Sequence, residues 1–128
     1  WDNGEYNTLQ PLGVEFHIMG TGFTWETQNR QADIEAATIV WQESKRMLAD
    51  AHYDLVVLDE LTYMLAYHYL DTQEVISAIE NRPAGQSVIV TGRGCHTLLL
   101  ELADTVSEIR PVKHAFDRGI QAQIGIDW

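Results

Sequence analysis

The stretch Leu55-Val56-Val57-Leu58-Asp59-Glu60 decides the fold class of this chain of 128 residues. Its four consecutive apolar residues are typical of a strand that is buried on both faces of a parallel sheet. Two carboxylates follow the strand directly, and open parallel sheets bind their ligands at the carboxyl ends of the strands. We therefore expect a parallel sheet with a candidate site at Asp59 and Glu60.

Strand and helix patterns alternate along the rest of the chain. Alternating or continuous apolar residues predict further strands at Val14–Met19 and Ser87–Val90. We also expect a strand at Thr105–Val112, which carries the polar residues of an outer position, and a short last strand at Ala122–Trp128. Apolar residues at helical spacing predict helices at Gln31–Ala51, Leu61–Tyr69, Thr72–Asn81 and His96–Ala103. This order predicts an α/β fold with a mostly parallel sheet flanked by helices. There is no repeat and no linker, so residues 1–128 are expected to form a single α/β domain.

The charge of the chain narrows the choice of partners. It has 8 basic and 19 acidic residues, a net charge of −11. Nucleic acids and anionic membrane surfaces are not expected as partners, because both require clustered Lys and Arg. The single cysteine, Cys95, fits a cytoplasmic protein. No apolar run approaches the roughly 18 residues of a membrane helix.

The carboxylate pair Asp59-Glu60 has two interpretations. An apolar strand that ends in carboxylates is the usual form of a Walker B segment, in which the carboxylate holds Mg²⁺ directly or through water. The alternative is a buried strand followed by a solvated helix N-terminus, where the helix dipole favours acidic residues.

Two further segments are candidate sites at strand ends. In Thr91–Gly94 (TGRG), backbone N–H groups and the Arg93 guanidinium would suit an anion, and the alternative is a tight turn with an exposed arginine. In Gly22–Arg30 (GFTWETQNR), the aromatic residues Phe23 and Trp25 would suit a flat ligand, and the alternative is that they anchor the loop to the core.

Taken together, these segments resemble the P-loop type of ATP:corrinoid adenosyltransferase. The matching stretches run almost from end to end of the chain. They are Asn3-Gly4-Glu5, Gly13-Val14-Glu15-Phe16, Thr21–Arg30 (TGFTWETQNR), Val56–Leu70 (VVLDELTYMLAYHYL), Val90–His96 (VTGRGCH) and Leu102–Gly125 (LADTVSEIRPVKHAFDRGIQAQIG). The resemblance implies a P-loop NTPase-like, or RecA-like, sheet.

The resemblance also implies a reaction. A corrinoid reduced to Co(I), such as cob(I)alamin, attacks the 5′ carbon of ATP; a cobalt–carbon bond forms and triphosphate leaves. Because the corrinoid is itself the nucleophile, the protein has to place the reactants and stabilise charge. The implied ligands are the corrinoid and ATP with Mg²⁺. The implied partners are a second copy of the chain, as a homodimer, and an electron donor such as a reduced flavoprotein.

The resemblance implies functional roles for two groups of residues. Glu60, with Asp59 beside it, is implied to hold Mg²⁺ on the ATP phosphates, and Arg93 to contact substrate, phosphate or corrinoid. Glu60 and Arg93 are therefore the implied catalytic residues.

The second group lies in the TGFTWETQNR segment and is implied to bind the corrinoid. Phe23 and Trp25 are implied to crowd the lower face of the corrin and displace its axial ligand, which makes Co(II) easier to reduce. Asn29 and Arg30 belong to the same motif without separate roles.

The chain departs from the family pattern in one large respect. The family opens with a strand, a G-x-x-x-x-G-K-[ST] loop that binds phosphates, and a helix. Here the only lysines are Lys45 and Lys113, and neither follows a glycine. We expect that a strand–loop–helix portion of about 30 residues is missing before Trp1. The hypothesis that follows is that the 128 residues alone bind ATP weakly or fold poorly.

Two other functions are compatible with parts of the pattern. A different P-loop ATPase would share only the Walker B strand, and it leaves the TGFTW loop unexplained. A non-catalytic fragment that binds corrinoid or a partner would fit the absent phosphate loop.

Overall fold

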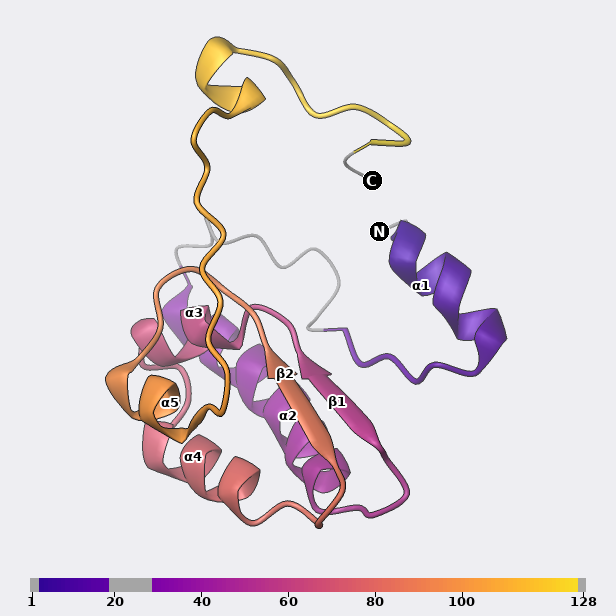
Figure 1. The fold of residues 1–128 in the computed structure, drawn as a ribbon, viewed down its shortest axis with the longest axis vertical. Helices are drawn as coiled ribbons and strands as arrows, with labels where there is room; N and C mark the ends of the chain where they lie inside the picture. The colour runs from indigo at the N-terminus through magenta and orange to yellow at the C-terminus, as the bar shows by residue number, and fades with distance from the viewer. Residues whose placement is uncertain (1–2, 19–28, 127–128) are drawn as a thin grey trace. The chain divides into compact units, whose positions relative to one another are not determined.

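The computed structural model describes residues 3–18 and 29–126, which fall into two compact units. One unit comprises Trp1–Phe16 and Thr105–Trp128, and the other comprises His17–Asp104. The second unit contains the sheet and the longer helices (Figure 1). It also contains both carboxylates and Arg93, so it is the unit that positions the candidate site.

The elements of His17–Asp104 follow the predicted order. They are α2 (Arg30–Leu48), β1 (Leu55–Leu58), α3 (Leu61–Ala66), α4 (Thr72–Glu80), β2 (Ser87–Val90) and α5 (Thr97–Leu102). The four predicted helices and the two central strands are thereby confirmed. Helix α3 ends earlier than predicted because His68 has φ 56°, and the N–H groups of His68 and Tyr69 bond back to Leu65 and Met64. This is a left-handed helix stop.

The sheet in the described residues consists of β1 and β2, which pair in parallel. Val56 lies opposite Val88, and Leu58 opposite Val90, on the face that packs against the helices. The prediction that β1 is buried on both faces is wrong, because Val57 is 54% exposed. The reason is that side chains alternate between faces and the helices of this unit cover only one of them.

A single hydrophobic core holds this unit together. It is built from residues of both layers, the helices and the sheet. The buried members are Trp41, Leu48, Val56, Leu58, Leu61, Leu65, Val75, Ile79 and Leu99. They come from α2, β1, α3, α4 and α5, and β2 packs against them from Val88 and Val90. The core therefore fixes the ends of β1 and β2, where the predicted site residues begin.

Gln86 joins the end of α2 to the start of β2. Its side chain is buried, and its Nε2 donates to the carbonyl oxygens of Met47, Asp50 and Tyr53 at 3.1–3.2 Å. These carbonyls lie at the end of α2 and in the loop before β1, where helix geometry leaves acceptors unpaired. One buried amide thus ties three backbone positions to the sheet.

Replacing Gln86 by Leu is expected to lower the free energy of unfolding by about 1–3 kcal/mol, the cost of leaving buried polar groups without a partner. Urea unfolding of the full-length protein measures this change. The matched control is Gln42→Leu on the exposed face of α2, which should change stability by less than about 0.5 kcal/mol. Equal effects of the two substitutions would contradict the role given to Gln86.

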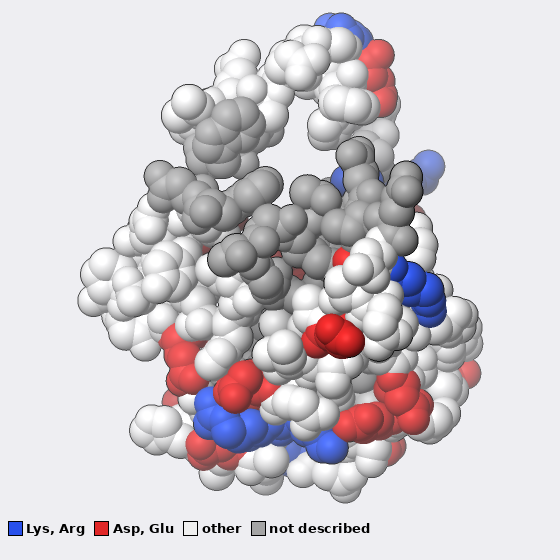
Figure 2. All heavy atoms as spheres, turned by 180° about the vertical axis from the view of Figure 1, so that it is seen from behind, with Lys and Arg blue, Asp and Glu red and all other residues white. Residues whose placement is uncertain are grey.

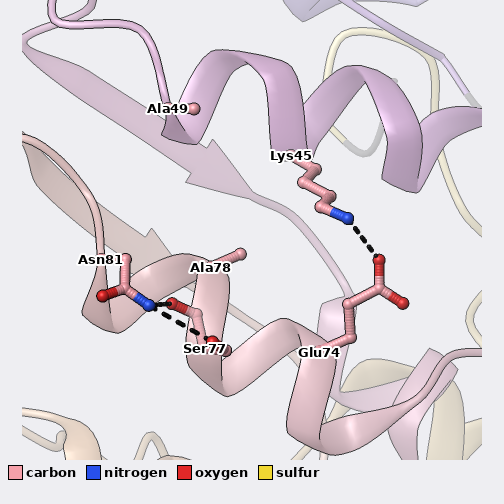
Figure 3. Close-up of a pocket in the computed structure, with 6 residues that line it drawn as sticks. All are labelled: Lys45, Ala49, Glu74, Ser77, Ala78 and Asn81. Carbon is pink, nitrogen blue, oxygen red and sulfur yellow. Dashed lines mark hydrogen bonds and ion pairs between the residues drawn. The ribbon is translucent and has the colours of Figure 1, made fainter.

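A shallow groove lies between α2 and α4, and Figure 3 shows its lining. The lining residues are Lys45, Ala49, Glu74, Ser77, Ala78 and Asn81. Glu74 bridges the two helices, because its Oε1 accepts from Lys45 Nζ at 2.9 Å and from Trp41 Nε1 at 3.2 Å. These bonds, first that from Lys45, lower the pKa of Glu74 below its ordinary value of 4.5.

The sign of this shift predicts a pH dependence. A carboxyl whose pKa is lowered by folding stabilises the native state above its unfolded pKa, and it loses that contribution as the pH falls through the folded pKa. We expect Glu74→Gln to cost under about 1 kcal/mol at pH 7, since the pair is solvent-exposed. The difference from wild type should vanish well below pH 4.5. Urea unfolding at several pH values, with exposed Glu80→Gln as control, checks this; a difference that persists in acid would contradict it.

The unit formed by Trp1–Phe16 and Thr105–Trp128 contains short helices and no buried residue among those described. Its elements are α1 (Gly4–Leu9), η1 (Gln10–Leu12) and η2 (Ala115–Arg118). Asn3 caps α1 by accepting from the Tyr6 N–H at 3.1 Å, and the Tyr6 and Phe16 rings meet edge to face. Helix α1 was not predicted, because its mostly polar residues show no apolar periodicity.

Three predicted strands are wrong over the residues described. Val14–Ile18, the described part of Val14–Met19, forms no strand, and neither do Thr105–Val112 or residues 122–126. Ile109 and Val112 are almost fully exposed, at 95% and 98%. A strand forms where a neighbour accepts and donates its ladder hydrogen bonds, so apolar alternation alone does not suffice.

The surface carries both signs of charge. On the face shown in Figure 2, basic side chains lie next to acidic ones over the lower part of the molecule. Two ion pairs involve residues of α2: Lys45–Glu74 at 2.9 Å, which links α2 to α4, and Arg46–Glu43 at 3.1 Å. In the part of the chain that the structure describes, no helix is both long and apolar enough to cross a membrane.

Candidate functional site

The first part of the site is the carboxylate pair that follows β1. Asp59 and Glu60 are both exposed. Glu60 has φ 58° and ψ 22°, a left-handed conformation that costs a non-glycine residue about 1–2 kcal/mol. Its side chain makes no capping bond to α3. No hydrogen bond from the Glu60 side chain therefore supports the alternative interpretation, in which the two carboxylates stabilise the N-terminus of α3.

The second part is the Thr91–Gly94 turn after β2. Gly92 has φ 147°, and a Cβ placed on it would lie 2.8 Å from Thr62 Cβ and still closer to the Thr62 hydroxyl oxygen. That hydroxyl donates to the Arg93 carbonyl oxygen at 3.3 Å. The start of α3 thus packs directly against the turn, and glycine is required at position 92.

Hydrogen bonds join the two parts. The Thr91 hydroxyl donates to Asp59 Oδ1 at 2.6 Å and accepts from the Glu60 N–H at 3.0 Å. The Thr91 N–H donates to the Leu58 carbonyl oxygen at 3.3 Å, which extends the ladder beyond β2. The carboxylate pair and the turn that carries Arg93 therefore form one connected edge at the carboxyl ends of two parallel strands.

Arg93 is exposed at this edge. Within residues 3–18 and 29–126 its guanidinium forms no hydrogen bond or ion pair, and a guanidinium is a group that suits an anion. In the same ranges no three His, Cys, Asp or Glu side chains come together as a metal cluster. A metal ion at Asp59 and Glu60 would therefore need ligands from a bound molecule or water.

The third part is the start of α2. Asn29 caps this helix, since its side chain accepts from the Ala32 N–H at 3.1 Å. Arg30 lies over the Tyr69 ring, 5.1 Å from its centre, a cation–π contact. Asn29 and Arg30 thus have structural partners where the TGFTWETQNR segment enters the helix. Phe23 and Trp25 lie outside the described residues.

A cluster of three tyrosines beside Arg30 was not expected from the sequence. The Tyr63 and Tyr67 rings stack at 4.2 Å, and Tyr69 completes the cluster at 6.0 Å from Tyr67. The Tyr69 hydroxyl donates to the buried Asp33 at 3.5 Å. Loss of hydration raises the pKa of Tyr69, with the Asp33 carboxylate acting in the same direction. The four-residue spacing of Tyr63 and Tyr67 was the available signal, but the left-handed turn that brings in Tyr69 was not visible.

The unit is an α/β unit whose parallel strands end in a carboxylate pair and an arginine-bearing turn, and the carboxyl ends of the strands are where α/β sheets of this class bind their ligands. The comparisons with known proteins make this specific. The family model described as ATP:corrinoid adenosyltransferase BtuR/CobO/CobP matches residues 1–128, and the chain belongs to this family. The resemblance inferred from the motifs is therefore confirmed.

Curated relatives match all or most of the chain. It is 67% identical over 128 residues to the corrinoid adenosyltransferase CobA of Salmonella typhimurium and 65% identical to that of Escherichia coli K12. It is 50% identical over 118 residues, 92% of the chain, to the Pseudomonas aeruginosa enzyme, of which it covers 58%. The chain spans 65% of the length of the first two relatives. A different ATPase that shares only the Walker B strand would not give a match of this extent.

Proposed function

We propose that the protein carrying this chain transfers the 5′-deoxyadenosyl group of ATP to the Co(I) centre of a corrinoid. The observation that carries the proposal is the match of the adenosyltransferase family to every residue of the chain. The connected edge formed by Asp59, Glu60 and Thr91 supports it, because such an edge is where an α/β sheet binds its ligand. Residues 1–128 are, in this proposal, part of one adenosyltransferase domain.

The donor atoms at this edge fit Mg²⁺. They are carboxylate oxygens, and Mg²⁺ prefers oxygen ligands and is commonly bound by one or two carboxylates together with substrate phosphates and water. Asp59 and Glu60 would hold the ion. When bound, Mg²⁺ neutralises charge on the triphosphate oxygens. The exposure of both carboxylates leaves them accessible to a nucleotide.

The remaining residues orient the two substrates. Arg93 would bind a phosphate oxygen through its guanidinium, which suits phosphate geometry better than an ammonium does. As cobalt attacks, the bond between the 5′ carbon and the phosphate oxygen breaks, and its electron pair stays on triphosphate. Charge stabilisation at the leaving group by Arg93 therefore lowers the barrier.

The corrinoid is assigned to the segment before α2. Phe23 and Trp25 would contact the lower face of the corrin, and Asn29 and Arg30 would hold the end of that segment through the cap and the stack on Tyr69. A homodimer, a reduced flavoprotein as electron donor and a cytoplasmic location complete the proposal. The homodimer and the electron donor rest on the family resemblance alone, and the location rests on the single cysteine.

An adenosylation assay tests the proposal. The full-length protein receives cob(I)alamin, ATP and Mg²⁺, and the absorbance change reports the formation of the cobalt–carbon bond. The proposal predicts conversion that depends on the protein, on ATP and on Mg²⁺. Tight ATP binding without any conversion of Co(I) would refute it and favour a binding module.

A further inference from the structure

The Thr91 hydroxyl occupies a central place at the candidate site without belonging to the set of predicted ligands. It contacts Asp59 through one hydrogen bond and Glu60 through another, at 2.6 and 3.0 Å. The first is a charge-assisted bond of the short kind that a hydroxyl makes to a carboxylate. One side chain from the end of β2 thus contacts both residues that follow β1.

The conformation of Glu60 explains why such a contact is needed. Glu60 is one of two non-glycine residues with positive φ in the described ranges, and such a conformation persists only where its surroundings determine it. The Glu60 N–H, which cannot join α3, finds its acceptor in Thr91 Oγ1. Thr91 therefore stabilises the turn that sets where the Glu60 side chain leaves the backbone.

The same hydroxyl restrains Asp59. Only Oδ1 of Asp59 is bonded to Thr91, and the side chain is exposed. The carboxylate is thus held at one oxygen while the group stays open to solvent. This is the arrangement in which a neighbouring group orients a metal-binding carboxylate without displacing the metal.

We propose that Thr91 is a positioning residue for the Asp59–Glu60 pair: its hydroxyl orients both carboxylate-bearing residues toward the Mg²⁺ of bound ATP. The proposal rests on the proposed function for the identity of that ligand. Thr91 does not touch the reacting atoms, and it acts through Asp59 and Glu60.

Three variants of the full-length protein separate the hydroxyl from the rest of the side chain. Thr91→Val keeps the shape and removes the hydroxyl, Thr91→Ser keeps the hydroxyl, and Thr97→Val is the matched control at the exposed start of α5. Mn²⁺ added with ATP is titrated by the electron paramagnetic resonance signal of the free ion. The rate of adenosylation is measured against Mg²⁺ concentration in parallel.

Thr91→Val is expected to raise the Kd for Mn²⁺ in the presence of ATP, and the Mg²⁺ concentration at half-maximal rate, by about 10–100-fold, as for other groups that orient metal ligands. Thr91→Ser and Thr97→Val should stay close to wild type. A Thr91→Val protein that unfolds at lower temperature but keeps the wild-type Kd for Mn²⁺ would overturn the proposal. Should Thr91→Val fail to fold, Thr91→Ala takes its place in the same titration.

The Mn²⁺ titration and the adenosylation rate test the role of Thr91 and the proposed function separately. If wild type binds Mn²⁺ with ATP but forms no cobalt–carbon bond, adenosyl transfer is refuted and the Mn²⁺ titration still decides the role of Thr91. If wild type forms no complex with Mn²⁺ and ATP, the positioning role itself is overturned.

Discussion

Glu60→Gln is expected to reduce the rate of adenosyl transfer by about 100-fold or more, the scale on which an electrostatic partner of a transition state contributes. The substitution removes the negative charge and keeps the shape of the side chain and the Glu60 N–H that donates to Thr91. The left-handed backbone and the start of α3 should therefore be preserved. The loss is expected mainly in the Mg²⁺-dependent part of ATP binding and in kcat.

Stopped-flow absorbance of the Co(I) corrinoid at saturating ATP measures this effect. Glu101→Gln, an exposed glutamate on α5, is the matched control and should leave the rate unchanged. Circular dichroism melting should show the same stability for both variants within about 0.5 kcal/mol. A Glu60→Gln protein with the wild-type rate at every Mg²⁺ concentration would exclude Glu60 from the metal site.

Gly92→Ala is expected to destabilise the protein by about 2–6 kcal/mol. Its φ of 147° lies in a region that is essentially limited to glycine, at a cost of about 1–3 kcal/mol. The new Cβ would also meet Thr62, which is buried and stiff, and such overpacking costs about 1–3 kcal/mol. Because Thr91 and Arg93 flank the glycine, ATP binding should weaken as well.

Gly94→Ala separates the cost of the backbone conformation from the cost of the contact with Thr62. Gly94 also has positive φ, 64°, but a Cβ there meets nothing within 4 Å. Only the cost of the left-handed backbone conformation applies, so the free energy of unfolding should fall by about 1–2 kcal/mol. Urea unfolding of both variants gives the comparison. Equal losses for Gly92→Ala and Gly94→Ala would show that the packing against Thr62 contributes nothing.

The parts of the fold that the sequence predicted correctly are those with local signals. β1 and β2 have continuous apolar residues, and α2 and α4 have helical periodicity together with caps at Asn29 and Asp71. The strands predicted at Val14–Met19 and Thr105–Val112 have apolar residues that are interrupted by polar ones. Whether such a segment pairs depends on a neighbour elsewhere in the chain, and alternation does not reveal that neighbour.

The residues of the candidate site could be predicted from the sequence. The hydrogen bonds and packing contacts between them could not. The positions of Asp59, Glu60 and Arg93 at strand ends follow from the order of elements. The hydrogen bonds of Thr91 and the contact of Gly92 with Thr62 depend on the register in which Leu58 lies opposite Val90, which is a three-dimensional property. Arg30 likewise gains its place over Tyr69 from the left-handed turn at His68.

The identity of the leaving group distinguishes adenosyl transfer from ATP hydrolysis. The full-length protein is incubated with cob(I)alamin, Mg²⁺ and a limiting amount of ATP, and the phosphate products are quantified by phosphorus nuclear magnetic resonance alongside the adenosylated corrinoid. For adenosyl transfer, we expect intact triphosphate in an amount equal to that of the new cobalt–carbon bond. ADP and phosphate formed without an adenosylated corrinoid would contradict it and identify an ordinary ATPase.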